Sequence, residues 1–226
     1  MDALDDSGIA NKVAAVREKI AAAAYDGGRD PESVALVAAT KMIDVGRIRA
    51  ALAAGIDAAG ENRAQELLEK APQLTDCRPA WHFIGRLQRN KVRLVAPWVT
   101  CWESVDRVEI GTAIAHHAPG AVVLVQVNVG NEPQKGGCEP AGVDALVDQL
   151  RHAGLDVRGL MAVPPQGSPP RPFFDELVAL ADALALPERS IGMSQDYEIA
   201  VSAGATIVRV GHAIFGDRRS AVNPEA

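Results

Sequence analysis

Aromatic residues make up only 4% of this 226-residue chain, and no stripe of basic residues with interleaved aromatics runs along it. Nucleic acid is therefore not expected as the main partner. No apolar run approaches the roughly 20 residues that a membrane span needs, so no membrane partner is expected either. The acidic N-terminus, MDALDDSGIANK, lacks a basic-then-apolar signal pattern, and we expect the protein in the cytoplasm.

Cysteine is also scarce. The three cysteines, Cys77, Cys101 and Cys138, are odd in number, far apart and without a C-x-x-C pair. Neither a disulfide framework nor a metal site is expected from them. Hydrophobic residues, by contrast, reach 48%, and the net charge is -6. This balance predicts one domain over residues 1–226 with a sizeable core, and we expect a monomer because no long exposed apolar helix face is evident.

Short apolar runs alternate with longer amphipathic ones along most of the chain. An alanine-rich helix is predicted first, over residues 9–25, followed by eight strand-and-helix units. Continuous apolar strands that alternate with helices indicate parallel pairing with both faces covered. We therefore predict an α/β fold, a (β/α)₈ TIM barrel with an extra N-terminal helix, with a doubly wound open sheet as the alternative. The predicted strands are 34–40, 56–60, 81–85, 99–103, 121–128, 157–163, 190–193 and 206–210.

Polar residues gather in or just after these strands, at the barrel edge where function usually lies. They include Lys41, Asn62, His82, Glu103, Ser194, Arg209 and Gly211. Each also has a purely structural interpretation. Asn62, Ser104 and Ser194 are suitable helix N-caps, and Glu66, Glu69 and Lys70 read as a solvated helix face.

Lys41 follows the first strand, where a neutral amine would be a nucleophile toward an aldehyde. Ser194 precedes a helix, and Gly211 lets backbone N–H groups approach an anion. An aldehyde site and a phosphate site on one barrel mouth fit pyridoxal 5′-phosphate. They fit the sugar phosphate of a lysine-dependent aldolase as well, and these residues do not decide between the two.

Longer sequence motifs distinguish between these two ligands. GEN, WHFIGRLQRNK and GMSQDYEIAVSAGATIVRVGHAIFG occur in this order at the predicted strand ends. With them, the chain resembles the pyridoxal phosphate homeostasis proteins, which are single-domain relatives of the alanine racemase barrel. The resemblance extends from about Ile9 to Gly216.

The resemblance implies pyridoxal 5′-phosphate as cofactor, carried by Lys41 as a Schiff base. It implies that Asn62 and His82 line the cofactor, that Met193 contacts its ring, and that Arg209 faces the pyridine nitrogen. It further implies that Ser194, Gly211 and His212 hold the phosphate. His212 departs from the family's usual threonine, and the segment after Lys41 lacks the family's usual proline.

An arginine at the pyridine nitrogen disfavours carbanion chemistry, because it keeps that nitrogen unprotonated. Racemases of this barrel also use a tyrosine from an additional domain, whereas the tyrosines of this chain, Tyr25 and Tyr197, read as helix residues. We therefore expect a carrier that binds the cofactor and delivers it to apo-enzymes, rather than an enzyme. The alternative is an amino-acid racemase that depends on the same cofactor.

Overall fold

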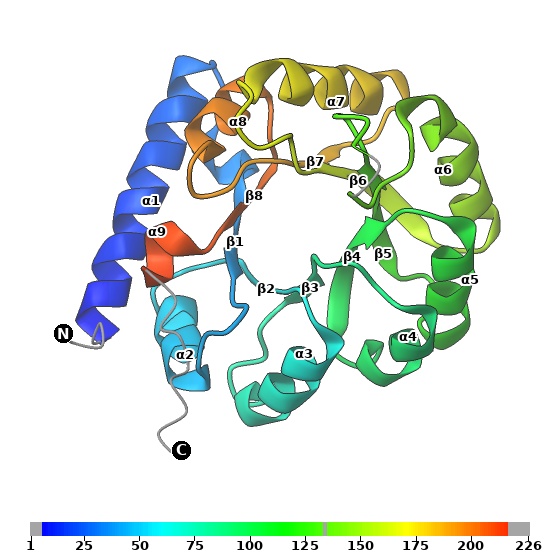
Figure 1. Cartoon of the computed structure of the whole chain (residues 1–226). Coiled ribbons are helices and arrows are strands. Elements are labelled where there is room, and N and C mark those ends of the chain that lie inside the picture. Colours follow the sequence, from blue (N-terminus) through cyan, green and yellow to red (C-terminus); the bar gives the residue numbers. More distant parts are fainter. Residues whose placement is uncertain (1–5, 133–134, 217–226) are drawn as a thin grey trace.

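A computed structural model describes residues 6–132 and 135–216 of the chain. Eight parallel strands close into a barrel in sequence order, and helices surround it (Figure 1). This confirms the predicted (β/α)₈ barrel over the open sheet. The strands are β1 (Ala35–Ala39), β2 (Ala58–Glu61), β3 (Trp81–Phe83), β4 (Val99–Val105), β5 (Val122–Val127), β6 (Asp156–Ala162), β7 (Glu188–Ser190) and β8 (Ile207–Val210).

The outer layer is made of helices that connect successive strands. They are α2 (Val45–Ala53), α3 (Ala64–Lys70), α4 (Arg89–Val95), α5 (Val108–His117), α6 (Val143–His152), α7 (Arg171–Ala183) and α8 (Tyr197–Ala203), and the four-residue α9 (His212–Phe215) follows β8. Short 3₁₀ turns lie at Pro31–Ser33, Ala71–Leu74 and Pro140–Gly142. Among the described residues, no helix combines the length and apolar composition that a membrane span requires.

The predicted extra helix is α1 (Asp6–Asp26), which lies outside the ring beside α2, α8 and α9 (Figure 1). It covers the place where the first and last strands pair, with Ala35 opposite Ile207 and Ala38 opposite Val210. Polar contacts add to the apolar packing there, because Arg17 binds Asp57 at 2.6 Å and Lys19 binds Glu198 at 3.0 Å.

The barrel core follows the two-residue alternation of strands. In β1, Leu36 and Ala38 pack outward against the helices. Val37 belongs instead to a separate interior cluster that the other strands share. The members of that cluster are Val37, Ala58, Cys101, Leu124, Met161 and Ile207. Two residues farther along β4 and β8 the interior becomes polar, with Glu103 and Arg209.

Some predicted boundaries were wrong. The seventh strand was placed at 190–193 but is β7, Glu188–Ser190. It ends early because Gly192 adopts φ +94°, where a Cβ would lie 2.6 Å from that of Ala200. Asn62 does not cap α3, whose N-cap is Arg63, and Ser104 does not cap α5, whose N-cap is Arg107. The short helix α9 was not predicted.

Candidate functional site

Lys41 lies in the turn between β1 and α2, two residues beyond the end of the strand. The next residue, Met42, has φ 60°, a left-handed conformation that is uncommon for a residue with a side chain. The Lys41 side chain is half-buried. Its amine has no hydrogen-bond or ion-pair partner among the described residues, so the structure leaves this amine available to a ligand.

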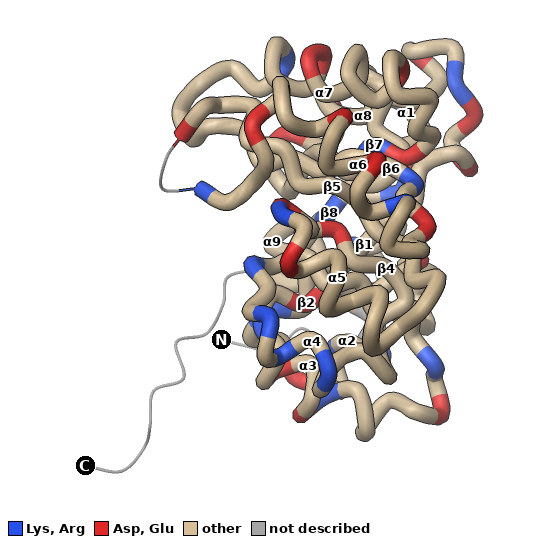
Figure 2. The backbone as a smooth tube through the Cα atoms, turned by 90° about the vertical axis from the view of Figure 1, so that its right-hand side faces the viewer, with Lys and Arg blue, Asp and Glu red and all other residues tan. Residues whose placement is uncertain are grey.

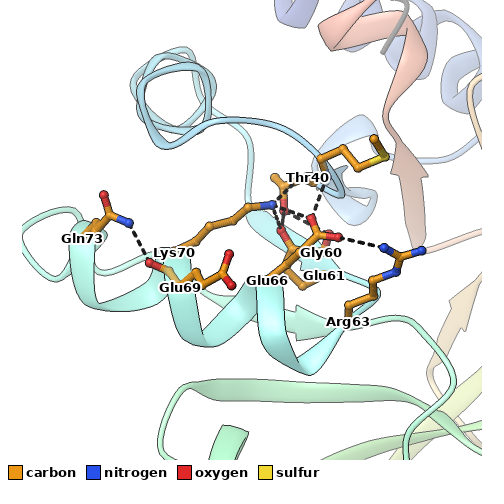
Figure 3. A network of polar contacts seen from close by, with 9 residues as sticks. Thr40, Gly60, Glu61, Arg63, Glu66, Glu69, Lys70 and Gln73 are labelled. Carbon is orange, nitrogen blue, oxygen red and sulfur yellow. Dashed lines mark hydrogen bonds and ion pairs between the residues drawn. The ribbon is translucent and has the colours of Figure 1, made fainter. Parts of the chain in front are cut away.

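A buried network of polar side chains lies directly behind this turn (Figure 3). The ammonium of Lys70, on α3, donates to Glu61 Oε1 at 2.6 Å, to Glu66 Oε2 at 3.0 Å and to the carbonyl of Thr40 at 2.8 Å. Glu66 in turn accepts from the backbone N–H of Met42 at 2.7 Å. The residues immediately before and after Lys41 are therefore both held by α3.

This network corrects the interpretation of Glu66 and Lys70 as a solvated helix face. Lys70 is only 8% exposed and Glu61 is fully buried. The Thr40 hydroxyl satisfies Glu61 further, at 2.7 Å. Charged residues spaced i,i+4 on a helix look the same in sequence whether they face water or a buried carboxylate on a neighbouring strand, so the error follows from the pattern itself.

The pKa values of the two carboxyl groups of the network, Glu61 and Glu66, are shifted in opposite directions. Burial raises the pKa of Glu61, and the hydrogen bond and charge of Lys70 only partly oppose this. For Glu66 burial acts in the same direction, but the Met42 N–H and Lys70 outweigh it and lower the pKa. One ammonium thus serves two carboxylates, of which the more buried one depends on it most.

A second group of polar atoms lies where β8 ends beside β1. Ser194 Oγ accepts from the N–H groups of Gly211 and Ala213, both at 3.2 Å. Ser194 therefore caps the start of α9, and not α8. Gly211 lies so close to β1 that a Cβ would be 3.2 Å from the carbonyl oxygen of Ala39, which places this group next to the Lys41 turn.

Met193 and Ser194 belong to a tight turn that leads into α8. The carboxylate of Asp196 accepts from the Met193 N–H at 2.6 Å, and the Met193 carbonyl accepts from Tyr197 N–H at 2.8 Å. Both Met193 and Ser194 are half-buried. The turn fixes the hydroxyl of Ser194 from one side, while α9 fixes it from the other.

Arg209 points into the barrel and is 5% exposed. It donates to the carbonyls of Ser190 at 2.7 Å and Ala162 at 2.9 Å, and it contacts the Ser190 hydroxyl. Glu103 lies 3.7 Å away and also accepts from Ser190 Oγ at 2.5 Å. Glu103 and Arg209 were predicted at the same barrel edge, and the structure brings them together as a buried pair.

His82 completes this interior network, since its Nδ1 donates to Glu103 Oε1 at 2.6 Å. Burial raises the pKa of Glu103, but His82, Arg209 and Ser190 outweigh burial and lower it. Burial lowers the pKa of Arg209, which Glu103 opposes. A carboxylate held in this way compensates a guanidinium that stays charged.

The remaining predicted site residues, Asn62, His212 and His82, lie on three different segments of the barrel. Asn62 follows β2, half-buried, and its backbone is pressed against Gly85, where a Cβ would lie 2.1 Å from the Asn62 carbonyl oxygen. His212 is the first residue of α9 and is exposed. His82 lies inside the barrel and also lines a cavity of about 780 Å³ at the amino ends of the strands, together with Cys101 and Glu188.

The structure thus brings Lys41, Ser194 and Gly211 together at the junction of β1 and β8, with Met193 and His212 beside them. Arg209 comes from the same strand as Gly211. His82 is joined to them through Glu103 rather than directly. Chemically, the arrangement offers an amine, a serine hydroxyl held by two backbone N–H groups, and a fixed guanidinium.

The comparisons with known proteins agree over nearly the whole chain. The model of the family "alanine racemase, N-terminal domain" matches residues 13–219. A pyridoxal phosphate homeostasis protein of Aquifex aeolicus is 40% identical over 222 residues, with 92% of this chain and 97% of that protein covered. The protein of the same name from Pseudomonas aeruginosa is 38% identical over 222 residues, with 94% and 96% covered.

Solved structures show the same relationship. A protein from Bifidobacterium adolescentis described as unknown superposes with a TM-score of 0.90 at 35% identity, over 95% of this chain and 97% of that one. PipY of Synechococcus elongatus, in a structure with bound pyridoxal phosphate, gives a TM-score of 0.78 at 32% identity, with 92% and 100% covered. Alanine racemase from Streptomyces lavendulae shares the fold at 20% identity. This chain belongs to the alanine racemase N-terminal domain family and, within it, to the pyridoxal phosphate homeostasis proteins.

Proposed function

We propose that this protein binds pyridoxal 5′-phosphate through a Schiff base on Lys41, holds it reversibly and delivers it to apo-enzymes. The observation that carries the proposal is the position of Lys41. Its amine lacks a partner in the described chain, while its neighbours Thr40 and Met42 are fixed by Lys70 and Glu66. Bound pyridoxal phosphate in PipY, a relative at 32% identity, supports the choice of ligand.

Ser194 and the N–H of Gly211 suit the phosphate group, because a hydroxyl and a backbone N–H both donate to phosphate oxygens. The Gly211 N–H donates to Ser194 Oγ at 3.2 Å in this structure and would be shared with the phosphate. Met193 would contact the ring, and Asn62 and His212 would line the site. Arg209 would face the pyridine nitrogen, and Glu103, itself held by His82, keeps the guanidinium in place. When bound, the cofactor would supply a reactive aldehyde, which the protein stores in place of leaving it free in solution.

The placement of the tyrosines favours a carrier over a two-base racemase. Tyr25 is 70% exposed on α1. Tyr197 is buried, and its hydroxyl is close enough for the charge of Lys19 on α1 to affect its pKa, which burial raises. Both phenols therefore belong to helices of the outer layer, α1 and α8, and neither tyrosine lies on a barrel strand.

The first experiment is a titration of the purified protein with pyridoxal 5′-phosphate, followed by the visible absorption band of the Schiff base. The band should form in the wild type and in Lys19→Ala, an exposed-lysine control, but not in Lys41→Ala. An equally strong band in Lys41→Ala, or none in the wild type, would contradict the proposal.

Delivery needs a separate measurement. The loaded protein is mixed with the apo-form of an enzyme that depends on pyridoxal phosphate, in the presence of a scavenger of free aldehyde. Recovery of activity above that from the same amount of free cofactor supports delivery. Turnover of a single-enantiomer amino acid by the loaded protein would instead favour the racemase.

A further inference from the structure

A concave basic surface lies on the same barrel rim as Lys41, two strands farther round. A cavity of about 590 Å³ opens there, between the ends of β2, β3 and β4 and the start of α4. Asn62, which was predicted to belong to the cofactor site, lines it together with Phe83. Its other lining residues are Arg63, Ala64, Gln65, Arg86, Leu87, Gln88, Lys91 and Arg107.

The charge of this lining is one-sided. It contains three arginines and one lysine but no aspartate or glutamate, in a chain whose net charge is -6. The segment RLQRNKVR, residues 86–93, has four cations and no acidic residue. The blue segments around α4 in Figure 2 show this concentration.

Two of these cations are not neutralised by the protein. Within residues 6–132 and 135–216, neither Arg86 nor Lys91 has an ion pair. Arg63 reaches Glu66 only at 3.9 Å, whereas Arg107 is occupied by Asp106 and by the carbonyl of Leu87. Like charges so close together repel one another, and a bound anion would relieve that repulsion.

We propose that this pocket is a second binding site, selective for a phosphate monoester. Guanidinium groups bind phosphate with paired, charge-assisted hydrogen bonds, and Arg63 and Arg86 both line the pocket. The carboxamides Gln65 and Gln88 add neutral donors, and Phe83 and Leu87 give the pocket an apolar component. Its volume admits a small aromatic phosphate ester but not a folded partner.

In the context of the proposed function, on which this choice of ligand rests, the monoester is pyridoxal phosphate on its way to or from Lys41. Lys91 supplies an amine in the pocket. The amine attacks the aldehyde carbon, a C=N bond forms and one water molecule leaves. Borohydride then reduces that bond by hydride transfer, which fixes the ligand at the lysine that captured it.

The test uses the full-length Lys41→Ala protein, treated with pyridoxal 5′-phosphate and borohydride, with the labelled lysines identified by peptide mass spectrometry. Lys91 should carry more label than the exposed Lys19. Adding Arg86→Gln should lower Lys91 labelling about tenfold. Arg93→Gln is the matched control, because it also removes one positive charge near Lys91 but lies outside this pocket, in the neighbouring cavity that Lys91 borders as well.

Pyridoxal, which has the aldehyde but no phosphate, should label Lys91 no more than Lys19, and inorganic phosphate should compete. The proposal is overturned if Lys91 and Lys19 are labelled equally by pyridoxal phosphate, or if Arg93→Gln lowers the label as much as Arg86→Gln does. Failure of the function proposed for Lys41 would appear separately, as a missing absorption band in the wild-type protein.

Discussion

Replacing Lys70 by methionine tests the network behind the reactive turn. The substitution keeps an unbranched apolar stem, one atom shorter than lysine, but removes the ammonium that Glu61, Glu66 and the Thr40 carbonyl share. Glu61, which is fully buried, would keep the Thr40 hydroxyl as its remaining donor. The variant therefore creates a buried carboxylate without a counter-charge.

Removal of one partner from a buried ion pair costs about 3–5 kcal/mol. Lys70 also holds a backbone carbonyl next to Lys41, so the upper part of this range is expected. For a chain of this length, each kcal/mol corresponds to about 2–4 °C in the melting temperature. A decrease on the order of 10 °C should result, and the affinity for pyridoxal phosphate should fall as well.

The loss of stability in Lys70→Met should increase as the pH rises. The pKa of Glu61 is already raised by burial, and the loss of Lys70 raises it further. When burial raises the pKa of a glutamate in the folded state, the protonated form fits the fold better than the charged form. The contribution to stability is therefore fully present below the unfolded pKa, about 4.3, and is lost as pH rises through the folded pKa. The deficit of Lys70→Met should be small near pH 4 and complete at neutral pH.

The free energy of unfolding is measured by urea denaturation at pH 4 and pH 7. The control is Lys19→Met, because Lys19 and its partner Glu198 are both more than half exposed and such pairs contribute about 0–1 kcal/mol. If Lys70→Met lies within 1 kcal/mol of this control at both pH values, the network does not stabilise the turn as described.

Three further predictions concern other parts of the rim and core. Gly85→Ala should lower the free energy of unfolding by about 2–4 kcal/mol, because its Cβ would meet the Asn62 carbonyl oxygen at 2.1 Å; in Gly27→Ala, where the nearest atom is 3.4 Å away, urea denaturation should detect almost no change. Ser194→Ala should raise the Kd for pyridoxal phosphate about tenfold in a spectroscopic titration, and an unchanged Kd would exclude the hydroxyl as a phosphate ligand. Glu103 has a lowered pKa, so its stabilisation is present above pH 4.3 and is lost on acidification; Glu103→Gln should flatten the fall in stability that the wild type shows below about that pH.

The barrel itself was predictable because a buried parallel strand leaves a direct pattern of consecutive apolar residues. The ends of the strands were harder to predict. The left-handed Gly192 ends β7 before the apolar run is over, and the four residues of α9 are too few to show a helical period.

Prediction of the site residues was limited by a different cause. Lys41 stands out in the sequence because a charge follows a buried strand. Lys70 does not, since its partners are Glu66 on its own helix and two residues on other segments, Glu61 and Thr40. Ser194 looked like the cap of the helix that follows it, yet its contacts lie on α9, which comes after another strand. Lys70 and Ser194 are thus each defined by contacts with segments that come together only when neighbouring strands pair.

The pairing of β1 with β8 also has a consequence for synthesis of the chain. Lys41 is made early and Gly211 late, and they become neighbours only when the last strand has docked on the first beneath α1. A nascent or truncated chain that ends before β8 would present the lysine without the donors that accompany it. Capture of the ligand at this junction would therefore report that the ring has closed, and an unfinished chain would not compete for the same small molecule.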